Sequence, residues 1–159
     1  MNFRIGFGFD VHPLSEDRQL VLGGIEIPHE KGALGHSDAD VLIHAICDAI
    51  LGAANLGDIG KHFPDTDHTL RNISSLVLLG KVREMLTQKR YRVVNIDSTV
   101  CLQRPKIQPY IPQMAERMSG AIKIPREAIS IKATTTEMLG FIGREEGVSA
   151  YAVALIEAV

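Results

Sequence analysis

Tryptophan is absent from this sequence of 159 residues, aromatic residues make up only 5% of it, and cysteine occurs twice, as Cys47 and Cys101. Two cysteines so far apart argue against a disulfide framework and suit a reducing cytosol. The longest apolar run, Ala150 to Ile156, is too short to span a bilayer, and the N-terminus has no hydrophobic signal core. We therefore expect a soluble, cytoplasmic protein.

Neither sign of charge is in excess. Lysine and arginine number 17 against 19 aspartates and glutamates, which gives a formal net charge of −2. No overall field therefore recruits nucleic acid or an anionic membrane, although a local basic pocket is compatible with this balance. Hydrophobic residues at 45% and charged residues at 23% are ordinary globular values. The length predicts one domain, residues 1–159, with a core that needs no disulfides.

Apolar spacing and turn residues predict the elements of the N-terminal third. Residues 4–12 form an expected strand, in which Gly6 and Gly8 suggest a close backbone approach. Residues 20–22 and 25–27 flank a Gly-Gly turn and predict a hairpin.

A helix is expected next, from a cap at Ser37 or Asp38 to about Asn55. Its apolar residues form one broad face, and Asp40, His44 and Asp48 follow one another at intervals of four on the opposite side. We expect this polar stripe to lie outside the core of its own subunit.

The loop between residues 56 and 70 is too rich in Gly, Pro and Asp for helix or central strand, and loops of this kind are often functional. The remaining expected elements are a helix over about 74–89, a strand over 91–103, a helix over about 109–120, a strand over 129–134, a short helical turn over 135–139 and a strand over 148–157.

Two histidines and a carboxylate are candidate metal ligands. Asp10 and His12 are two residues apart on the first strand, so both side chains point to one face, and His44 lies on the polar side of the first helix. Together they would form the three-ligand open site expected of catalytic zinc. The alternatives are an Asp-His hydrogen bond at a strand end and a solvated histidine, and spacing alone does not decide between them.

Two segments carry features of a phosphate site. Ser37, preceded by His36, stands where a helix N-terminus would present free N–H groups, although Ser37 could equally serve only as a cap. Residues 132–137 close a strand with three consecutive threonines, and Glu137 offers oxygen to a hard cation such as Mg²⁺. The spacing of Thr134 and Glu137 also matches a capping box, which is the structural alternative.

Further polar residues allow simple structural explanations. Asp58, Asp65 and Asp67 fit Asx-turns, or binding of the hydroxyls of a polyol. Arg104, Lys106 and Arg144 fit surface charges, with Lys106 in a stiff proline-flanked loop the best candidate for a phosphate contact, and Phe9 and Phe141 fit core positions.

Taken together, these motifs resemble the family of 2-C-methyl-D-erythritol 2,4-cyclodiphosphate synthases of the non-mevalonate isoprenoid pathway. The resemblance covers essentially the whole chain. Its motifs are residues 8–12 (GFDVH), 36–40 (HSDAD), His44, 56–60 (LGDIG), 63–67 (FPDTD), 105–106 (PK), 132–137 (KATTTE) and Gly140-Phe141 through Gly143-Arg144.

The resemblance assigns roles residue by residue. It implies that Asp10, His12 and His44 ligate Zn²⁺, that Glu137 holds a second divalent cation (Mg²⁺ or Mn²⁺), and that His36 and Thr135 stabilise the transition state. The substrate-binding residues that it implies are Asp10, Val11, His12, His36, Ser37, Asp58, Ile59, Gly60, Phe63, Pro64, Asp65, Thr66, Asp67, Leu102, Gln103, Arg104, Pro105, Lys106, Ile107, Gln108, Lys132, Thr134, Thr135, Thr136, Glu137, Phe141 and Arg144.

The resemblance further implies an α+β fold, a two-layer sandwich of a mixed β-sheet and helices, that assembles as a homotrimer with active sites between subunits. The implied reaction is closure of a cyclic diphosphate with release of CMP from a cytidyl diphosphate substrate. In some members the trimer axis encloses an apolar cavity for an isoprenoid diphosphate, where Phe9, Phe141 and Arg144 occupy matching positions. Two other functions are compatible with the residues: a zinc hydrolase, and a non-catalytic trimeric binding protein with structural zinc.

Overall fold

The computed structural model describes residues 2–159. Its strands are β1 (Phe3–Ser15), β2 (Leu20–Leu22), β3 (Ile25–Ile27), β4 (Gly32–Ala33), β5 (Tyr91–Cys101), β6 (Ile129–Thr134) and β7 (Gly147–Ala158). Its α-helices are α1 (Val41–Ala53), α2 (Ile59–His62), α3 (Ser75–Gln88), α4 (Ile111–Ile122) and α5 (Gly140–Gly143), and its 3₁₀ turns are η1 (His68–Leu70), η2 (Gln108–Tyr110) and η3 (Arg126–Ala128).

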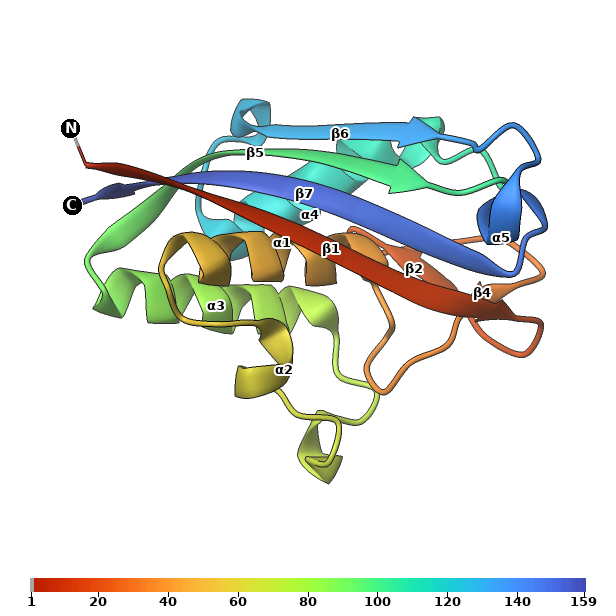
Figure 1. The fold of residues 1–159 in the computed structure, drawn as a ribbon, viewed down its shortest axis with the longest axis horizontal. Helices are drawn as coiled ribbons and strands as arrows, with labels where there is room; N and C mark the ends of the chain where they lie inside the picture. The colour runs from red at the N-terminus through yellow and green to blue at the C-terminus, as the bar shows by residue number, and fades with distance from the viewer. Residues whose placement is uncertain (1) are drawn as a thin grey trace.

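Five strands form one mixed sheet in the order β4-β1-β7-β5-β6. β5 and β6 are parallel, and the other neighbouring strands are antiparallel. Helices α1, α3 and α4 lie on one side of this sheet (Figure 1). A mixed sheet covered on one face by helices is the α+β architecture that the resemblance implied, and it is confirmed.

The closest contact between the two layers is the one between α1 and β1. A Cβ atom at Gly8 would lie 1.9 Å from the carbonyl oxygen of Ala45, and one at Gly6 would lie 1.8 Å from that of Ala49. Two glycines on one face of the strand and two alanines one turn apart on the helix therefore let backbone meet backbone. The expected close approach is confirmed, and α1 is buried on nearly all sides.

The first helix begins later than the sequence pattern predicted. Its N-cap is Asp40, whose Oδ1 accepts from the backbone N–H of Ile43 at 3.1 Å, so a cap at Ser37 or Asp38 is wrong. The same carboxylate accepts from Gly23 N at 3.0 Å and Gly24 N at 2.7 Å. Asp40 is fully buried, because it ties the turn of the β2–β3 hairpin to the helix. It therefore does not share the half-buried stripe of His44 and Asp48.

Two loop predictions also need correction. The glycine-rich loop after α1 contains one helical turn, α2, because the Asp58 side chain caps it by accepting from Lys61 N at 2.9 Å. Residues 135–139 form no helical turn, because Glu137 and Met138 have φ angles of 53° and 65°, in the left-handed region. A short helix, α5, follows these residues instead.

The later elements agree with the predictions to within a few residues. In β5 the register shifts between Val93 and Asn95, so Val93 takes the buried position and Val94 is only half-buried. This bulge changes which residues of the strand face the core. None of the helices among residues 2–159 has the length and apolar character needed to cross a membrane.

The other face of β1 is apolar and open. Its exposed side chains are Phe3, Ile5, Phe7, Phe9 and Val11, and Tyr151 and Val153 extend the patch onto β7. Phe7 is 63% exposed, and the Tyr151 ring lies with its centroid 5.1 Å from that of Phe9. A contiguous apolar strip of this kind on a sheet face is a candidate interaction surface.

The contact between α1 and β1 predicts a sharp difference between two glycines. Gly8→Ala should destabilise the fold by about 3 kcal/mol or more, because a backbone carbonyl occupies the space of the new methyl group. Gly52→Ala, on an open surface of α1, is the matched control and should stabilise by about 0.5–1 kcal/mol. Urea denaturation of the two variants measures both values, and a Gly8→Ala variant as stable as the parent contradicts the close packing.

Candidate active site

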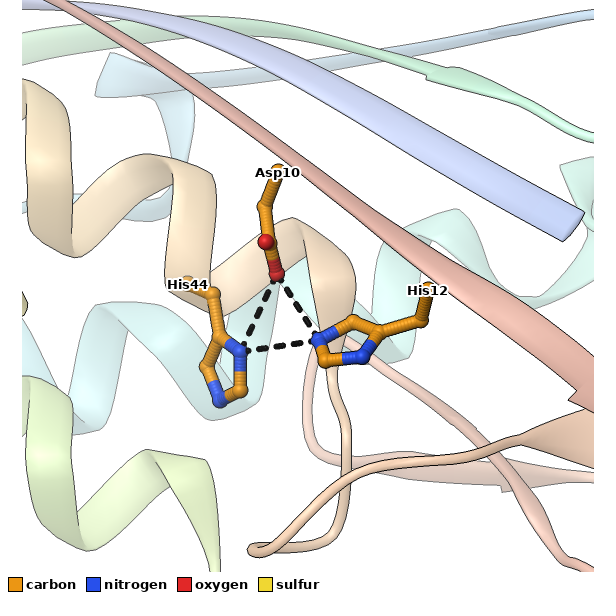
Figure 2. A group of neighbouring side chains, drawn as sticks. All are labelled: Asp10, His12 and His44. Atoms are coloured by element: carbon orange, nitrogen blue, oxygen red, sulfur yellow. Dashed lines mark hydrogen bonds and ion pairs between the residues drawn. The ribbon is translucent and has the colours of Figure 1, made fainter. Parts of the chain in front are cut away.

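Three potential metal ligands converge beside the first helix (Figure 2). Asp10 Oδ2 lies 2.9 Å from His12 Nε2 and 3.1 Å from His44 Nδ1, and the two ring nitrogens are 3.2 Å apart. Ligand atoms about 2.0–2.1 Å from a tetrahedral ion are about 3.3 Å from one another. The triangle therefore has the size of one face of a zinc coordination tetrahedron.

The close contact between α1 and β1 sets this geometry. Asp10 and His12 follow Gly6 and Gly8 on the same face of β1, since all four positions alternate with the exposed apolar residues. His44 precedes Ala45, the residue whose carbonyl lies against Gly8. The helix is therefore near enough for the His44 ring to reach the carboxylate of Asp10.

Hydrogen bonds outside the triangle determine which nitrogen of each ring has a lone pair for a metal ion. His12 Nδ1 lies 2.9 Å from the carbonyl oxygen of Leu34, which can only accept, so Nδ1 carries the proton and Nε2 keeps a lone pair. The Ser75 hydroxyl donates to Asp38, and it therefore accepts from His44 Nε2 at 2.9 Å. In the neutral ring with this tautomer, His44 Nδ1 has a lone pair for a metal ion at the centre of the triangle, and it donates to Asp10 Oδ2 only when both ring nitrogens carry protons.

The sequence pattern did not identify Ser75 and Asp38 as parts of this arrangement. The sequence places Ser75 only within the expected second helix, and it indicates Asp38 as a candidate cap. Both are explained by their contacts, because Asp38 Oδ2 also accepts from Ser75 N at 2.9 Å at the start of α3. No local signal in the sequence links residues 37 positions apart.

The metal-free triad is strongly polarised. Burial opposes the charge of Asp10, but hydrogen bonds and charge from His12 and His44 outweigh it and lower the pKa of Asp10 to about 2. Burial likewise opposes the charge of His12, but the hydrogen bond and charge of Asp10 outweigh it and raise the pKa of His12. The carboxylate of Asp10 thus faces an imidazole that binds a proton readily, and this proton must leave before a metal ion can bind between the two groups.

A cavity of about 430 Å³ opens over the triad. It brings together many of the predicted substrate residues. Those on its walls are Asp10, His12, His36, Ser37, Ile59, Gly60, Phe63 and Asp65, and the predicted metal ligand His44 lies among them. Sequence reasoning missed the apolar part of the wall, which is formed by Leu34, Leu70, Ile73 and Leu78.

Other residues predicted for this region form hydrogen bonds with the loop over residues 56–70. His36 Nε2 lies 3.0 Å from the carbonyl oxygen of Asp67, and Asp67 Oδ1 accepts from Thr69 N at 2.9 Å. The Asx-turn expected at Asp67 is therefore confirmed. Pro64 and Thr66 belong to the same loop, and Val11 is on the opposite, open face of β1.

A second cavity, of about 230 Å³, gathers the residues predicted for the cytidine side. Its walls contain Leu102, Gln103, Pro105, Lys106, Ile107, Gln108, Thr134 and Thr135, together with Ala133, which the sequence had not indicated. The two cavities have no wall residue in common. One chain therefore brings the predicted site residues together as two separate groups.

The remaining predicted residues line neither cavity. Lys132 Nζ donates to Asp97 at 2.6 Å, Arg104 forms an ion pair with Glu145, and Arg144 forms an ion pair with Glu146 at 3.0 Å. Thr136 donates to the carbonyl oxygen of Leu139, and Phe141 is 42% exposed rather than in the core. Glu137 is exposed and does not join the Asp10 triad.

The fold and this centre define an α+β protein with an open three-ligand metal site. The chain belongs to the YgbB family, whose model matches residues 3–157. A relative from Bacteroides thetaiotaomicron, named 2-C-methyl-D-erythritol 2,4-cyclodiphosphate synthase, is 61% identical over 99% of both chains. The resemblance derived from the motifs is thereby confirmed.

Solved structures agree with this assignment. The CDP complex of IspF from Plasmodium falciparum is 34% identical, covers 99% of this chain and 97% of its own, and has a TM-score of 0.86. The bifunctional IspDF from Campylobacter jejuni is 40% identical over 99% of this chain with a TM-score of 0.95. The match spans 43% of that longer protein.

The polarised triad predicts how zinc binding depends on pH. Zinc requires a neutral His12, and the pKa of His12 in the metal-free protein lies above the ordinary value of 6.5, so protons compete at a higher pH than for a free histidine. Affinity for zinc should fall steadily from about pH 8 to about pH 5, with Asp10 ionised throughout.

Competition with a chromophoric chelator at each pH measures this affinity. His68→Gln removes a histidine outside the triad and should leave the profile unchanged. A zinc affinity that does not change between pH 8 and pH 5 would contradict the ligand set.

Proposed function

We propose that this protein converts 4-diphosphocytidyl-2-C-methyl-D-erythritol 2-phosphate to 2-C-methyl-D-erythritol 2,4-cyclodiphosphate and CMP. The observation that carries the proposal is the convergence of Asp10, His12 and His44 at the floor of a cavity in a chain whose relatives bear this enzyme's name. An oxygen of the 2-phosphate bonds to the β-phosphorus, and the bond between that phosphorus and the oxygen of CMP breaks. CMP leaves with the electron pair.

The donor set supports Zn²⁺ as the resident metal. Two imidazole nitrogens and one carboxylate oxygen are the ligands of catalytic zinc sites, which keep a fourth position for substrate. Asp10, His12 and His44 would hold the ion, which supplies Lewis-acid neutralisation of phosphate charge. We propose Glu137 as the ligand of a second cation, Mg²⁺ or Mn²⁺, because its exposed carboxylate stands in the threonine segment of the other group.

The chain's own residues bind and orient the substrate. The attacking phosphate is already anionic, so no general base is required, and catalysis consists of positioning and charge stabilisation. His36 Nε2–H donates to the Asp67 carbonyl at 3.0 Å, which holds the ring in the cavity wall, and we assign this residue the stabilisation of phosphate charge in the transition state. We assign Thr135 the same stabilising role from the second group, and Lys106 and Gln103 to the cytidine and phosphate side.

Assembly of three copies supports this reaction by joining the two groups. The first cavity holds the proposed metal ligands and His36, and the second holds Thr135 and Lys106. Placing the second cavity of one copy against the first cavity of the next would complete each site. The open apolar face of β1 provides a surface for such an assembly.

Side chains on this face, on α5 and at the C-cap of α5 support the isoprenoid hypothesis. Phe9 and Phe141 are exposed apolar rings, and Arg144 offers a guanidinium once it releases Glu146. We therefore keep an isoprenoid diphosphate on the assembly axis as a proposed ligand. A melting temperature that farnesyl diphosphate leaves unchanged would remove it.

We also propose that residues 1–159 act as one unit in the cytoplasm. One continuous hydrophobic core, which includes residues from β2 to β7, supports the first statement. The second is supported by the free thiols of Cys47 and Cys101, since reduced cysteines are typical of cytosolic proteins.

Product analysis tests the reaction against its two competitors. Zinc-loaded protein incubated with substrate and Mg²⁺ should release CMP and give the phosphorus-31 spectrum of a cyclic diphosphate, and a chelator should abolish both. CMP without the cyclic product would indicate a hydrolase, and no turnover would indicate a binding protein.

His44→Ala should lose zinc and activity, whereas Thr135→Ala should keep zinc and lose about 100-fold in kcat.

Sedimentation tests the assembly. The protein should run at three times its 17.4 kDa chain mass, and Phe7→Lys should dissociate it by placing a charge in the apolar face. Val77→Lys, an equally drastic change at an exposed position of α3, is the control and should stay trimeric. A monomeric parent protein with full activity would exclude sites shared between copies.

A further inference from the structure

A third cavity, which we call the basin, lies beside the cavity over the triad, and its walls carry positive charge. It measures about 440 Å³, and its walls include Arg18, His68 and Arg71. It shares Gly35, His36 and Asp65 with the cavity over the triad. The two spaces are therefore neighbours across the His36 side chain, and a ligand in one can extend into the other.

Within the described part of the chain, neither arginine of this basin has a carboxylate partner, and a backbone carbonyl holds one of them in place. Arg18 is half-buried, and its Nη2 donates to the carbonyl oxygen of Gly35 at 2.8 Å. Within residues 2–159, neither Arg18 nor Arg71 forms an ion pair, whereas Arg92, Arg104 and Arg144 each have a glutamate. Asp65 is the single carboxylate on the basin wall against these two guanidinium groups.

The neighbouring carboxylates are occupied elsewhere or lie on another surface. Arg18 also borders a depression that contains Asp17 and Asp38. Asp38 accepts from both the N–H and the hydroxyl of Ser75, as part of the chain that orients His44. Guanidinium groups without committed partners are suited to an anion, and their planar N–H donors match the oxygens of a phosphate.

We propose that Arg18 and Arg71 bind the 2-phosphate of the substrate, the group that attacks. This inference rests on the proposed function. Ring closure brings the 2-phosphate into contact with the β-phosphate, and two anionic phosphates repel at that distance. When the diphosphate lies over the triad, the basin on the other side of His36 supplies positive charge for the 2-phosphate. The arginines keep their protons throughout, so they are binding and positioning residues.

Two ligands that differ by one group test the assignment. One is the substrate, and the other is 4-diphosphocytidyl-2-C-methyl-D-erythritol, which lacks the 2-phosphate and cannot form the cyclic diphosphate. In Arg18→Gln and Arg71→Gln, kcat/KM for the substrate should fall about 10- to 100-fold, mainly through KM. The Kd of the ligand without the 2-phosphate should stay within about twofold, since the lost contact is absent from it.

The controls separate this proposal from the function on which it rests. Arg117→Gln removes an exposed arginine of α4 and should change neither constant, and all variants should keep the zinc content of the parent. If the arginine variants bind both ligands more weakly by the same factor, the arginines are structural supports and the proposal is overturned. An unchanged KM for the substrate would overturn it as well. If the parent protein releases no CMP, the proposed function fails. The Kd values of the two ligands, measured directly, then show whether the basin binds the 2-phosphate.

Discussion

Backbone contact between α1 and β1 is the constraint on which the metal centre depends. Gly6 and Gly8 remove the side chains that would separate the layers, and the carbonyl groups of Ala49 and Ala45 occupy that space. The strand continues with Asp10 and His12 on the same face, and the helix supplies His44 next to the contact. A layer spacing set by ordinary side chains would hold the His44 ring away from the carboxylate.

Orientation of the ligands depends on elements outside this pair. Leu34 holds the His12 ring by its backbone carbonyl, and Ser75 at the start of α3 holds the His44 ring and is itself held by Asp38. Three separate segments thus leave one lone pair on each ring directed at the same point. Such outer contacts set both the tautomer and the basicity of metal-ligating histidines.

Periodicity and turn chemistry predicted most of the fold, because the helices and the hairpin are built from local signals. The cap of the first helix was predicted wrongly because a distant group decides the local structure there. Asp40 caps α1 because its carboxylate also receives the N–H groups of Gly23 and Gly24, and spacing along the helix contains no trace of that contact. The ligand triad was predictable as chemistry, but its convergence was not, since Asp10 and His44 are joined by packing rather than by sequence. Ser75 and the apolar cavity wall were missed for the same reason.

Separation of the site residues into two cavities has a genetic consequence. Defects at His44 and at Thr135 lie in different halves, so each damaged chain still carries the half that the other lacks. If the proposed assembly places the second cavity of one copy against the first cavity of the next, an oligomer that mixes both kinds of chain contains pairs of intact halves, and each such pair restores a working centre. Two inactive alleles can then complement each other within a single oligomer, an outcome that is closed to an enzyme whose residues all belong to one chain.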